Sequence, residues 1–200
     1  MSEIVTLPPT DDCELRRFAA VDLVLCHWER LRDGRPMPQR AEIDPHALAR
    51  ALEFMFIAEP VAPRVARLRL SGQHLSCLLG MEPRGMPLCA LFAGRDRDEL
   101  TLAVEQVSRH HARVMLPLGA ETGIGRPALK GMMALLPLAD ETGRASRILG
   151  VLQTRGTVGR SPRKLTLTGP AETLPVMPER PDPAVGRPQL RVITGGLDQP

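Results

Sequence analysis

The chain has 200 residues, 43% hydrophobic and 24% charged, which is the composition of one ordinary globular domain. Its formal net charge is only +3, and 26 basic residues are scattered among 23 acidic ones, so we expect no nucleic-acid partner. No apolar run reaches the ~20 residues of a membrane span, and the acidic N-terminus lacks the apolar core of a signal peptide. A cytoplasmic protein is therefore expected.

The first predicted element is an amphipathic helix over residues 13–32, which follows a flexible segment 1–12. Its apolar side chains return every three or four positions: Leu15, Phe18, Val21, Leu25 and Trp28. Such a helix needs an apolar surface to lie on. Gly34 and Pro36 end it, and an arginine-rich loop begins there.

A short helix is predicted from Pro45 to Leu52. Asp44 is an N-cap residue whose carboxylate accepts free backbone N–H groups. The proline that follows it suits the first helical position, because its φ angle is already fixed. One helix, a short surface loop and a second helix are therefore expected in this part of the chain.

Two strands are predicted next. The apolar run 54–57 is typical of a strand covered on both faces. In the segment 65–71 apolar and polar residues alternate. The apolar members are expected on one face: Ala66, Leu68 and Leu70. Pro60 and Pro63 are expected in the turn of this hairpin.

Two further helices and three strands complete the predicted domain. The helices are expected at Gly72–Leu79 and at Arg95–His111, where the longer one buries Leu100, Ala103, Val104 and Val107. The strands are expected at Arg113–Leu118, Ala128–Leu138 and Ser146–Thr154. The segment 122–127, TGIGRP, precedes a strand and lacks the Lys-Ser/Thr of a phosphate loop, so it is predicted to be a hairpin loop.

This order of elements predicts an α+β domain over residues 13–155. Two hairpin strands, helices and a three-strand meander imply one antiparallel sheet with helices on one face. The central strands are apolar on the other face as well, so the N-terminal helix of this chain or of a second copy should cover it. Residues 156–200 are rich in proline, glycine and arginine. They are expected to form an extended arm with β-like pieces at Leu165–Thr168 and Leu190–Thr194.

The chain resembles a proteobacterial PAS-like family. The matching residues of the opening segment are Trp28, Leu31, Arg32, Gly34, Arg35, Pro38, Arg40, Asp44 and Pro45. A second matching block runs from Arg69 through Leu79-Gly80 to Gly85. The resemblance implies a five-stranded antiparallel sheet whose helices enclose a potential small-molecule pocket. It also implies a sensory or regulatory role, exerted through ligands, dimerisation or a separate signalling partner protein.

We expect a non-catalytic regulatory module that acts through ligand binding or protein–protein interaction. The alternatives are a purely structural dimerisation module and an enzyme that uses the PAS cavity. No Ser-His-Asp or Cys-His grouping and no HExxH motif is seen, and the cysteines lack CxxC spacing. We therefore predict no catalytic residue, no metal and no cofactor. We also predict a homodimer with the helix 13–32 at or near the interface.

The candidate site residues are Trp28, Arg32, Arg35 and Arg40. Arginines in such a loop can clamp an anionic ligand, because a guanidinium binds a carboxylate or phosphate through two hydrogen bonds. The alternative is that they hold the helix and loop together by pairing with Asp33, Glu42 or Asp44. We expect the structural role at Arg35 and Arg40. Trp28 is expected to be a packing anchor, and His111 to cap its helix.

Overall fold

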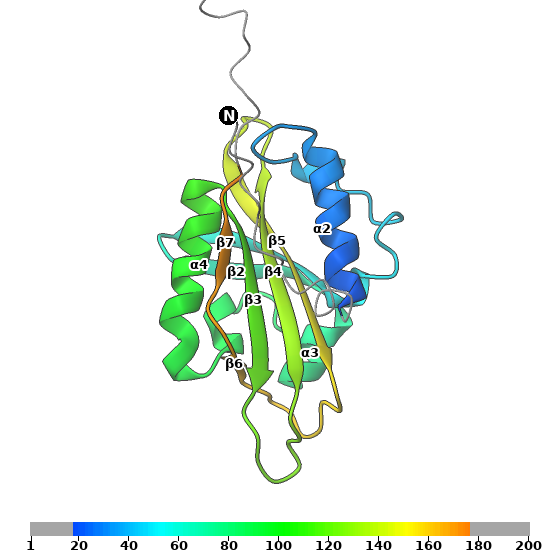
Figure 1. Ribbon diagram of the computed structural model, residues 1–200, viewed down its shortest axis with the longest axis vertical. Helices are drawn as coiled ribbons and strands as arrows, with labels where there is room; N and C mark the ends of the chain where they lie inside the picture. Colours follow the sequence, from blue (N-terminus) through cyan, green and yellow to red (C-terminus); the bar gives the residue numbers. More distant parts are fainter. Residues whose placement is uncertain (1–17, 177–200) are drawn as a thin grey trace, which may run out of the picture.

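The centre of the computed structural model, which describes residues 18–176, is one curled antiparallel sheet (Figure 1). Its strands are β1 (Met55–Ala62), β2 (Val65–Ser71), β3 (Arg113–Ala120), β4 (Lys130–Ala139), β5 (Ala145–Arg155), β6 (Leu165–Leu167) and β7 (Glu172–Leu174). Their order is β2-β1-β5-β4-β3-β6, and β7 also pairs with β3. The predicted α+β architecture is confirmed, but the described sheet has seven strands where we expected five.

The two extra strands come from the segment after residue 155. Both β6 and β7 pair with β3, which lies at the end of the predicted meander. Leu165 is buried in the main core, and Arg163, two residues before it, is also buried. The first part of the expected arm 156–200 is thus built into the sheet. The expected β-like piece at Leu190–Thr194 and the flexible segment 1–12 lie outside the described residues.

One face of the sheet is covered by α3 (Gln73–Leu79) and α4 (Arg97–His110). Two 3-10 turns, η3 (Leu88–Leu91) and η4 (Gly94–Asp96), lead from one helix to the other. The apolar face of α4 is buried as predicted, although η4 delays the start of the helix to Arg97. A single apolar core forms between these helices and the inner side of the sheet.

The opposite face of the sheet is covered by α2 (Ala19–Arg32). In Figure 1, α2 and α4 lie on opposite sides of the sheet. Val21, Val24 and Trp28 are each 0% exposed and form a second core with residues of β4 and β5. The N-terminal helix of the same chain therefore covers this face, which is one of the two arrangements that we expected. Residues 13–17 of the predicted helix lie outside the described range.

Strand β2 departs from simple alternation at a β-bulge. Ile57 of β1 pairs with Leu70, but the next residue, Ala58, pairs with Leu68, so Arg69 is an extra residue. The bulge turns Leu70 to the face opposite Leu68, and its side chain is 51% exposed. Our expectation that Ala66, Leu68 and Leu70 share one face is therefore wrong at Leu70.

Two further local predictions are wrong. Pro60 lies within β1 and pairs with Ala66, not in the turn. This is tolerated because β1 pairs only with β2 beyond Ala58, where a missing N–H costs least. Residues 45–51 form consecutive turns, followed by the 3-10 turn η2 (Leu52–Phe54), in place of the helix predicted from Pro45. Asp44 nevertheless accepts a hydrogen bond from the His46 N–H at 2.9 Å. Among residues 18–176, no helix is long and apolar enough to cross a membrane.

Candidate functional site: an arginine-rimmed groove

The arginine loop begins where α2 ends. Asp33 adopts a left-handed conformation with φ 45°, which turns the chain away from the helix axis. Arg35 then folds back on the last turn of α2. Its Nε donates to the Arg32 carbonyl at 3.0 Å, and its Nη2 donates to the Leu31 carbonyl. These are carbonyls that a helix end leaves without partners, so Arg35 caps the C-terminus of α2.

Arg35 also ties the helix end to the loop. Its Nη2 lies 2.8 Å from Oε1 of Glu42, and the other carboxylate oxygen of Glu42 accepts the Gln39 N–H at 2.6 Å. The hydrogen bond from Arg35, reinforced by that from Gln39, lowers the pKa of Glu42. Both contacts favour the structural role that we expected for Arg35.

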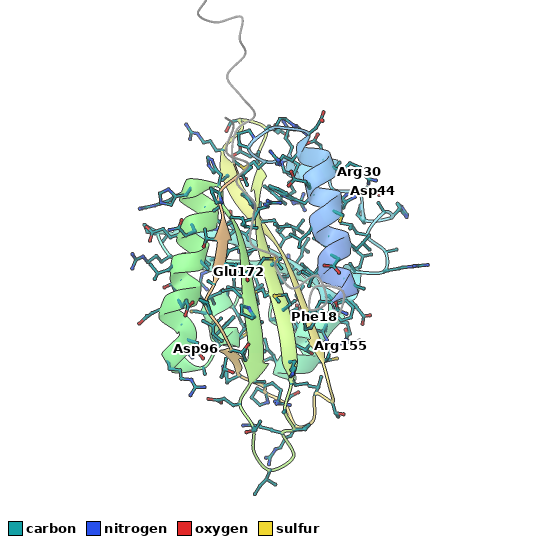
Figure 2. All side chains as sticks on the ribbon, in the orientation of Figure 1. Phe18, Arg30, Asp44, Asp96, Arg155 and Glu172 are labelled. Carbon is teal, nitrogen blue, oxygen red and sulfur yellow. The ribbon has the colours of Figure 1, made fainter. Side chains whose placement is uncertain are left out.

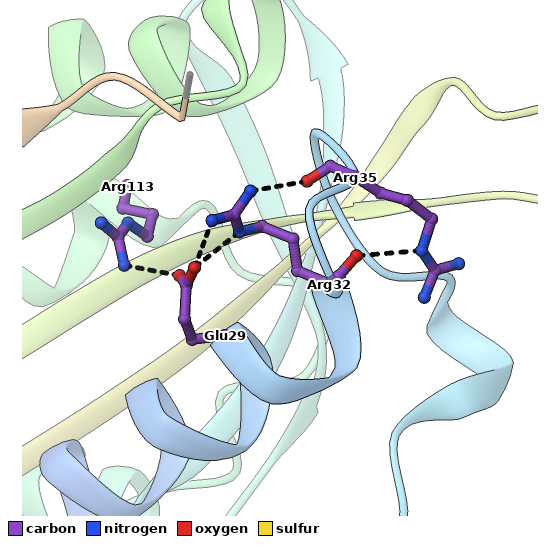
Figure 3. Close-up of polar contacts among 4 residues, drawn as sticks. All are labelled: Glu29, Arg32, Arg35 and Arg113. Atoms are coloured by element: carbon purple, nitrogen blue, oxygen red, sulfur yellow. Dashed lines mark hydrogen bonds and ion pairs between the residues drawn. The ribbon is translucent and has the colours of Figure 1, made fainter. Parts of the chain in front are cut away.

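Glu29 and Trp28 attach α2 to the sheet, and Arg32 holds the Glu29 carboxylate in place. The Glu29 carboxylate accepts hydrogen bonds from Arg32 of its own helix and from Arg113 of β3 (Figure 3), the latter at 2.8 Å. The Arg113 guanidinium lies 5.9 Å from the centre of the Trp28 ring. Trp28 Nε1 donates to the buried Pro137 carbonyl of β4 at 2.9 Å. Trp28 therefore packs as an anchor in the core, whereas the Arg32 side chain hydrogen-bonds, within the described part of the chain, only to Glu29 and the Arg35 carbonyl.

Sequence reasoning missed Arg113 and Glu29 in this group. Glu29 and Arg32 are three residues apart in one helix, a spacing that brings side chains together, so that pair was visible in the sequence. Arg113 lies 84 residues away from Glu29. Only the pairing of β3 within the sheet brings it beside α2, and no local pattern indicates this contact.

Arg40 differs from the other loop arginines. It begins the 3-10 turn η1 (Arg40–Glu42), which Pro38 and Gln39 fix to the end of β4: the Ala139 N–H donates to the Pro38 carbonyl at 2.9 Å. The Arg40 side chain makes no hydrogen bond or ion pair with any other described residue. It is exposed, so the structural contacts expected for Arg40 with Asp33, Glu42 or Asp44 are not formed.

Three adjoining hollows meet at Arg40, with volumes of about 420, 370 and 330 Å³. The largest is a groove on the α2 side of the sheet, between the loop and the β1–β2 edge. Its apolar lining includes Ile43, Leu52, Ile57 and Leu70. Leu70 belongs to this lining because the bulge at Arg69 turns it to the outer face, beside Ile57.

The hollow of about 330 Å³ is rimmed by four arginines: Arg40, Arg69, Arg84 and Arg147. The single carboxylate among its lining residues is Glu59, which accepts hydrogen bonds from Arg69 at 2.5 Å and from Arg147 at 2.8 Å. The bond from Arg69 is the main cause of the lowered pKa of Glu59. Positive charge therefore predominates in this hollow, next to the apolar groove, whereas the hollow of about 370 Å³ is lined by Asp140 and Glu141 as well as by Arg40 and Arg147. We call the hollows of about 420 and 330 Å³, which share Arg40, Ile57 and Leu70, the arginine groove.

The inner side of the sheet offers a different environment. It is filled by fully buried apolar side chains, among them Phe56, Leu68, Phe92 and Leu116. His111 is half-buried and follows the last residue of α4 in a left-handed conformation, φ 54°, at the helix C-cap. Within residues 18–176, no group of three or more His, Cys, Asp or Glu side chains is placed to hold a metal ion.

These features define a PAS fold, and the comparison with known families agrees. The chain belongs to the PAS domain family, whose model matches residues 17–153. PAS domains are in general sensory or regulatory modules, so the family places the chain in that broad class. No curated protein matches the chain.

The solved structures to which the chain is similar include a light-oxygen-voltage domain, a light-oxygen-voltage receptor and a PAS domain. The blue-light photoreceptor Aureochrome1 LOV, in its light state, is 16% identical over 55% of this chain and 87% of that one, with a TM-score of 0.41. An RNA-binding Light-Oxygen-Voltage receptor is 19% identical over 58% of this chain and 35% of that one, also at 0.41. The PAS domain of a protein from Colwellia psychrerythraea is 14% identical over 54% of this chain and 92% of that one, with a TM-score of 0.39.

Proposed function

We propose that this protein is a non-catalytic regulatory PAS module that binds an anionic group in the arginine groove. The observation that carries the proposal is the β-bulge at Arg69. It places Leu70 on the outer face of the sheet, within reach of the arginines that rim the neighbouring hollow. Bulges often re-aim a side chain beside a functional site.

The groove favours a particular ligand chemistry. A carboxylate or phosphate would lie between Arg40 and Arg84, since neither side chain is engaged with another described residue. A guanidinium binds either anion through paired hydrogen bonds. An apolar part of the same ligand, or of a partner protein, would lie on Ile57 and Leu70. In pockets of this kind a few polar groups orient the ligand, and apolar contacts provide most of the affinity.

The groove is better suited to binding than to catalysis. Glu59, its one carboxylate beside the four arginines, accepts hydrogen bonds from two of them and has a lowered pKa. A carboxylate held in this way is a weak base, whereas a general base needs a pKa near the working pH. We propose that the protein is not an enzyme, since two arginines hold Glu59 and, among the described residues, neither hollow of the arginine groove is lined by a His, a Cys or a second carboxylate. Cytoplasmic location stays a prediction from the sequence.

Homodimerisation also stays a prediction. A dimer was expected because the N-terminal helix has an apolar stripe and the central strands are apolar on the outer face of the sheet, so that a second copy could bury one on the other. In the structure the stripe is buried on the sheet of the same chain. The buried side of α2 is therefore not free for a second copy, and light scattering at tens of micromolar protein decides whether a dimer forms through another surface.

A thermal-shift experiment tests the ligand proposal. We would add one of three ligands. ATP presents phosphates, citrate presents carboxylates, and decanoate presents a carboxylate on an apolar chain. A ligand present at 100 times its Kd stabilises the native state by about 2.7 kcal/mol. This raises the Tm by roughly 5–10 °C for a chain of this size. At least one of the three should do so with the wild type.

The matched control uses two exposed arginines. Arg40→Ala should keep the unliganded Tm and lose the shift. Arg95→Ala removes an exposed arginine in η4, which lies outside the groove. This variant should keep both the unliganded Tm and the shift caused by the ligand. A shift that survives Arg40→Ala would contradict the proposed site. If none of the three ligands gives a shift, the small-ligand form of the proposal is wrong.

A further inference from the structure

The β3–β4 loop projects from one end of the sheet (Figure 1), and it carries an unusual side chain. Ile124 is 98% exposed, whereas Met81, the next most exposed large apolar side chain of the described residues, is 59% exposed. A fully exposed isoleucine gains nothing from the folded state, since its apolar surface stays in water. The shape of the loop must therefore come from other contacts.

The loop is tightly built. Gly123 and Arg126 exchange backbone hydrogen bonds of 3.1 and 2.9 Å, which closes a turn with Ile124 and Gly125 at its tip. Gly125 has φ 69°, a conformation that favours glycine. The Arg160 N–H donates to the Gly125 carbonyl at 2.7 Å, so the segment after β5 supports the tip from one side.

A buried arginine fixes the base of the same loop. Arg163 is 1% exposed, and its guanidinium donates to the carbonyls of Val158, of Glu121 at 3.1 Å and of Pro127 at 2.6 Å. Glu121 and Pro127 lie on the two arms of the loop, so one side chain holds both. Burial, with the nearby charge of Arg126, lowers the pKa of Arg163. Burying a charge costs free energy. In this protein the buried guanidinium of Arg163 holds in place a loop that has an exposed apolar residue at its tip.

The loop and the segment that supports it are rich in basic residues. The segments 121–130 and 155–164 hold six basic residues and one acidic residue, Glu121. Arg163 is buried and Lys164 donates to the Ala90 carbonyl, which leaves four basic side chains at the surface: Arg126, Lys130, Arg155 and Arg160. None of the four forms an ion pair with a described carboxylate.

Two of these charges lie directly opposite each other. Lys130 begins β4 and pairs with Arg155 at the end of β5. Figure 2 shows Arg155 in the lower half of the sheet, the half from which the β3–β4 loop projects. Like charges at such a position destabilise a sheet. The pair therefore adds positive charge at this end of the molecule and nothing to its stability.

We infer that this end of the molecule docks on an anionic phospholipid bilayer, with Ile124 inserted at the headgroup boundary. An exposed apolar residue with basic neighbours matches such a surface, because the residue is buried among lipid chains while the cations attract the headgroups. A bilayer needs no complementary pocket. One apolar residue and about four charges give weak, reversible attachment.

Other partners fit the same end less well. A stable protein interface buries about 800 Å² on each partner, and a single protruding side chain offers no flat patch of that size. Single-stranded nucleic acid is bound by stacking on aromatic side chains. The segments 121–130 and 155–164 contain none, and the chain has no tyrosine at all.

Vesicle co-sedimentation of the full chain tests this inference. The wild type should bind vesicles of phosphatidylcholine mixed with phosphatidylglycerol and should not bind phosphatidylcholine alone. Ile124→Ser should weaken binding roughly tenfold or more, since one buried isoleucine is lost. Lys130→Gln and Arg155→Gln should each weaken it roughly fivefold. Met81→Ser, which removes an exposed apolar side chain outside the loop, should change nothing.

The indole introduced by Ile124→Trp reports directly on insertion. The native Trp28 is fully buried, so a water-soluble quencher should reach only the indole at position 124. Anionic vesicles should protect that indole from the quencher. Failure of the wild type to bind anionic vesicles, or undiminished binding by Ile124→Ser, would overturn the inference. If single-stranded RNA bound while vesicles did not, the surface would be assigned to nucleic acid instead.

Discussion

The ring of Phe56 lies directly on the backbone of Gly150, its register partner in the neighbouring strand. A Cβ built at position 150 would overlap three ring atoms, Cζ, Cε1 and Cε2 of Phe56. The inner core of this PAS domain therefore depends on a glycine in the middle of β5, where only a hydrogen atom leaves room for the ring.

Gly150→Ala should destabilise the protein by about 1–3 kcal/mol, because the added methyl group forces the Phe56 ring to move within a packed core. Gly123→Ala is the matched control, since nothing lies within 4 Å of a Cβ at that position. Urea unfolding followed by circular dichroism measures both. Equal midpoints for the two variants would show that the core tolerates the methyl group.

Arg35 and Arg40 should differ in their effect on stability. Arg35→Ala removes hydrogen bonds to the end of α2 and the partly exposed pair with Glu42, so we expect a loss of about 0.5–1.5 kcal/mol. Arg40→Ala should stay within about 0.5 kcal/mol of the wild type, because its side chain has no partner among the described residues. The free energy of unfolding in urea measures both. A larger loss for Arg40→Ala would mean that Arg40 has a structural role.

The stability of the protein should fall as the pH drops from neutral towards 5. Burial lowers the pKa of His74 below its ordinary value of 6.5, and it lowers that of His27 as well. Below pH 6.5 the unfolded chain therefore binds protons that the folded chain does not yet bind, which favours unfolding. The contribution is complete above the unfolded pKa and is lost as the pH falls through the folded one.

His74→Gln removes one of these two groups. His74 lies with its Nε2 3.0 Å from the Thr154 hydroxyl and with its ring edge-on to Phe54. The variant should be less stable at pH 7.5 but should lose less stability between pH 7.5 and pH 5.5 than the wild type does. Urea midpoints at the two pH values give the comparison. Parallel losses in the two proteins would exclude His74 as a source of the pH dependence.

Trp28 should stabilise the fold through its Nε1–H group as well as through the size of its ring. Trp28→Phe keeps an aromatic ring but leaves the buried Pro137 carbonyl without the Nε1–H donor, which we expect to cost about 1–3 kcal/mol. Far-ultraviolet circular dichroism should follow the unfolding, since Trp28 is the single tryptophan of the chain. An unchanged free energy of unfolding would show that the carbonyl finds another donor.

The sequence predicted the parts of the fold that follow from periodicity. The apolar stripe of Val21, Val24 and Trp28 specifies a helix with one buried face, and the apolar strands required a cover on both sides. It did not predict the bulge at Arg69. A bulge adds one residue to one strand, and which residue that is depends on the partner strand and not on local alternation.

The candidate site was predicted only in part for the same reason. The arginine loop was visible as a cluster, but the roles of its members depend on contacts made elsewhere. Arg35 meets carbonyls of its own helix, whereas Arg40 faces Arg84 and Arg147 from distant segments. The helix predicted from Pro45 also failed, because the chain between Asp44 and Leu52 must turn towards β1 and forms single turns instead.

Chemical-shift mapping by NMR tests the central claim most directly, which is that ligands bind the outer arginine groove and not the inner side of the sheet. We would titrate the isotope-labelled protein with whichever of ATP, citrate and decanoate raises its Tm. The account predicts shifts for the backbone amides of Arg40, Ile57, Leu70 and Arg147, with little change in α3 and α4. Shifts concentrated in Leu75, Leu78, Leu100 and Val104, which line the inner core, would contradict it.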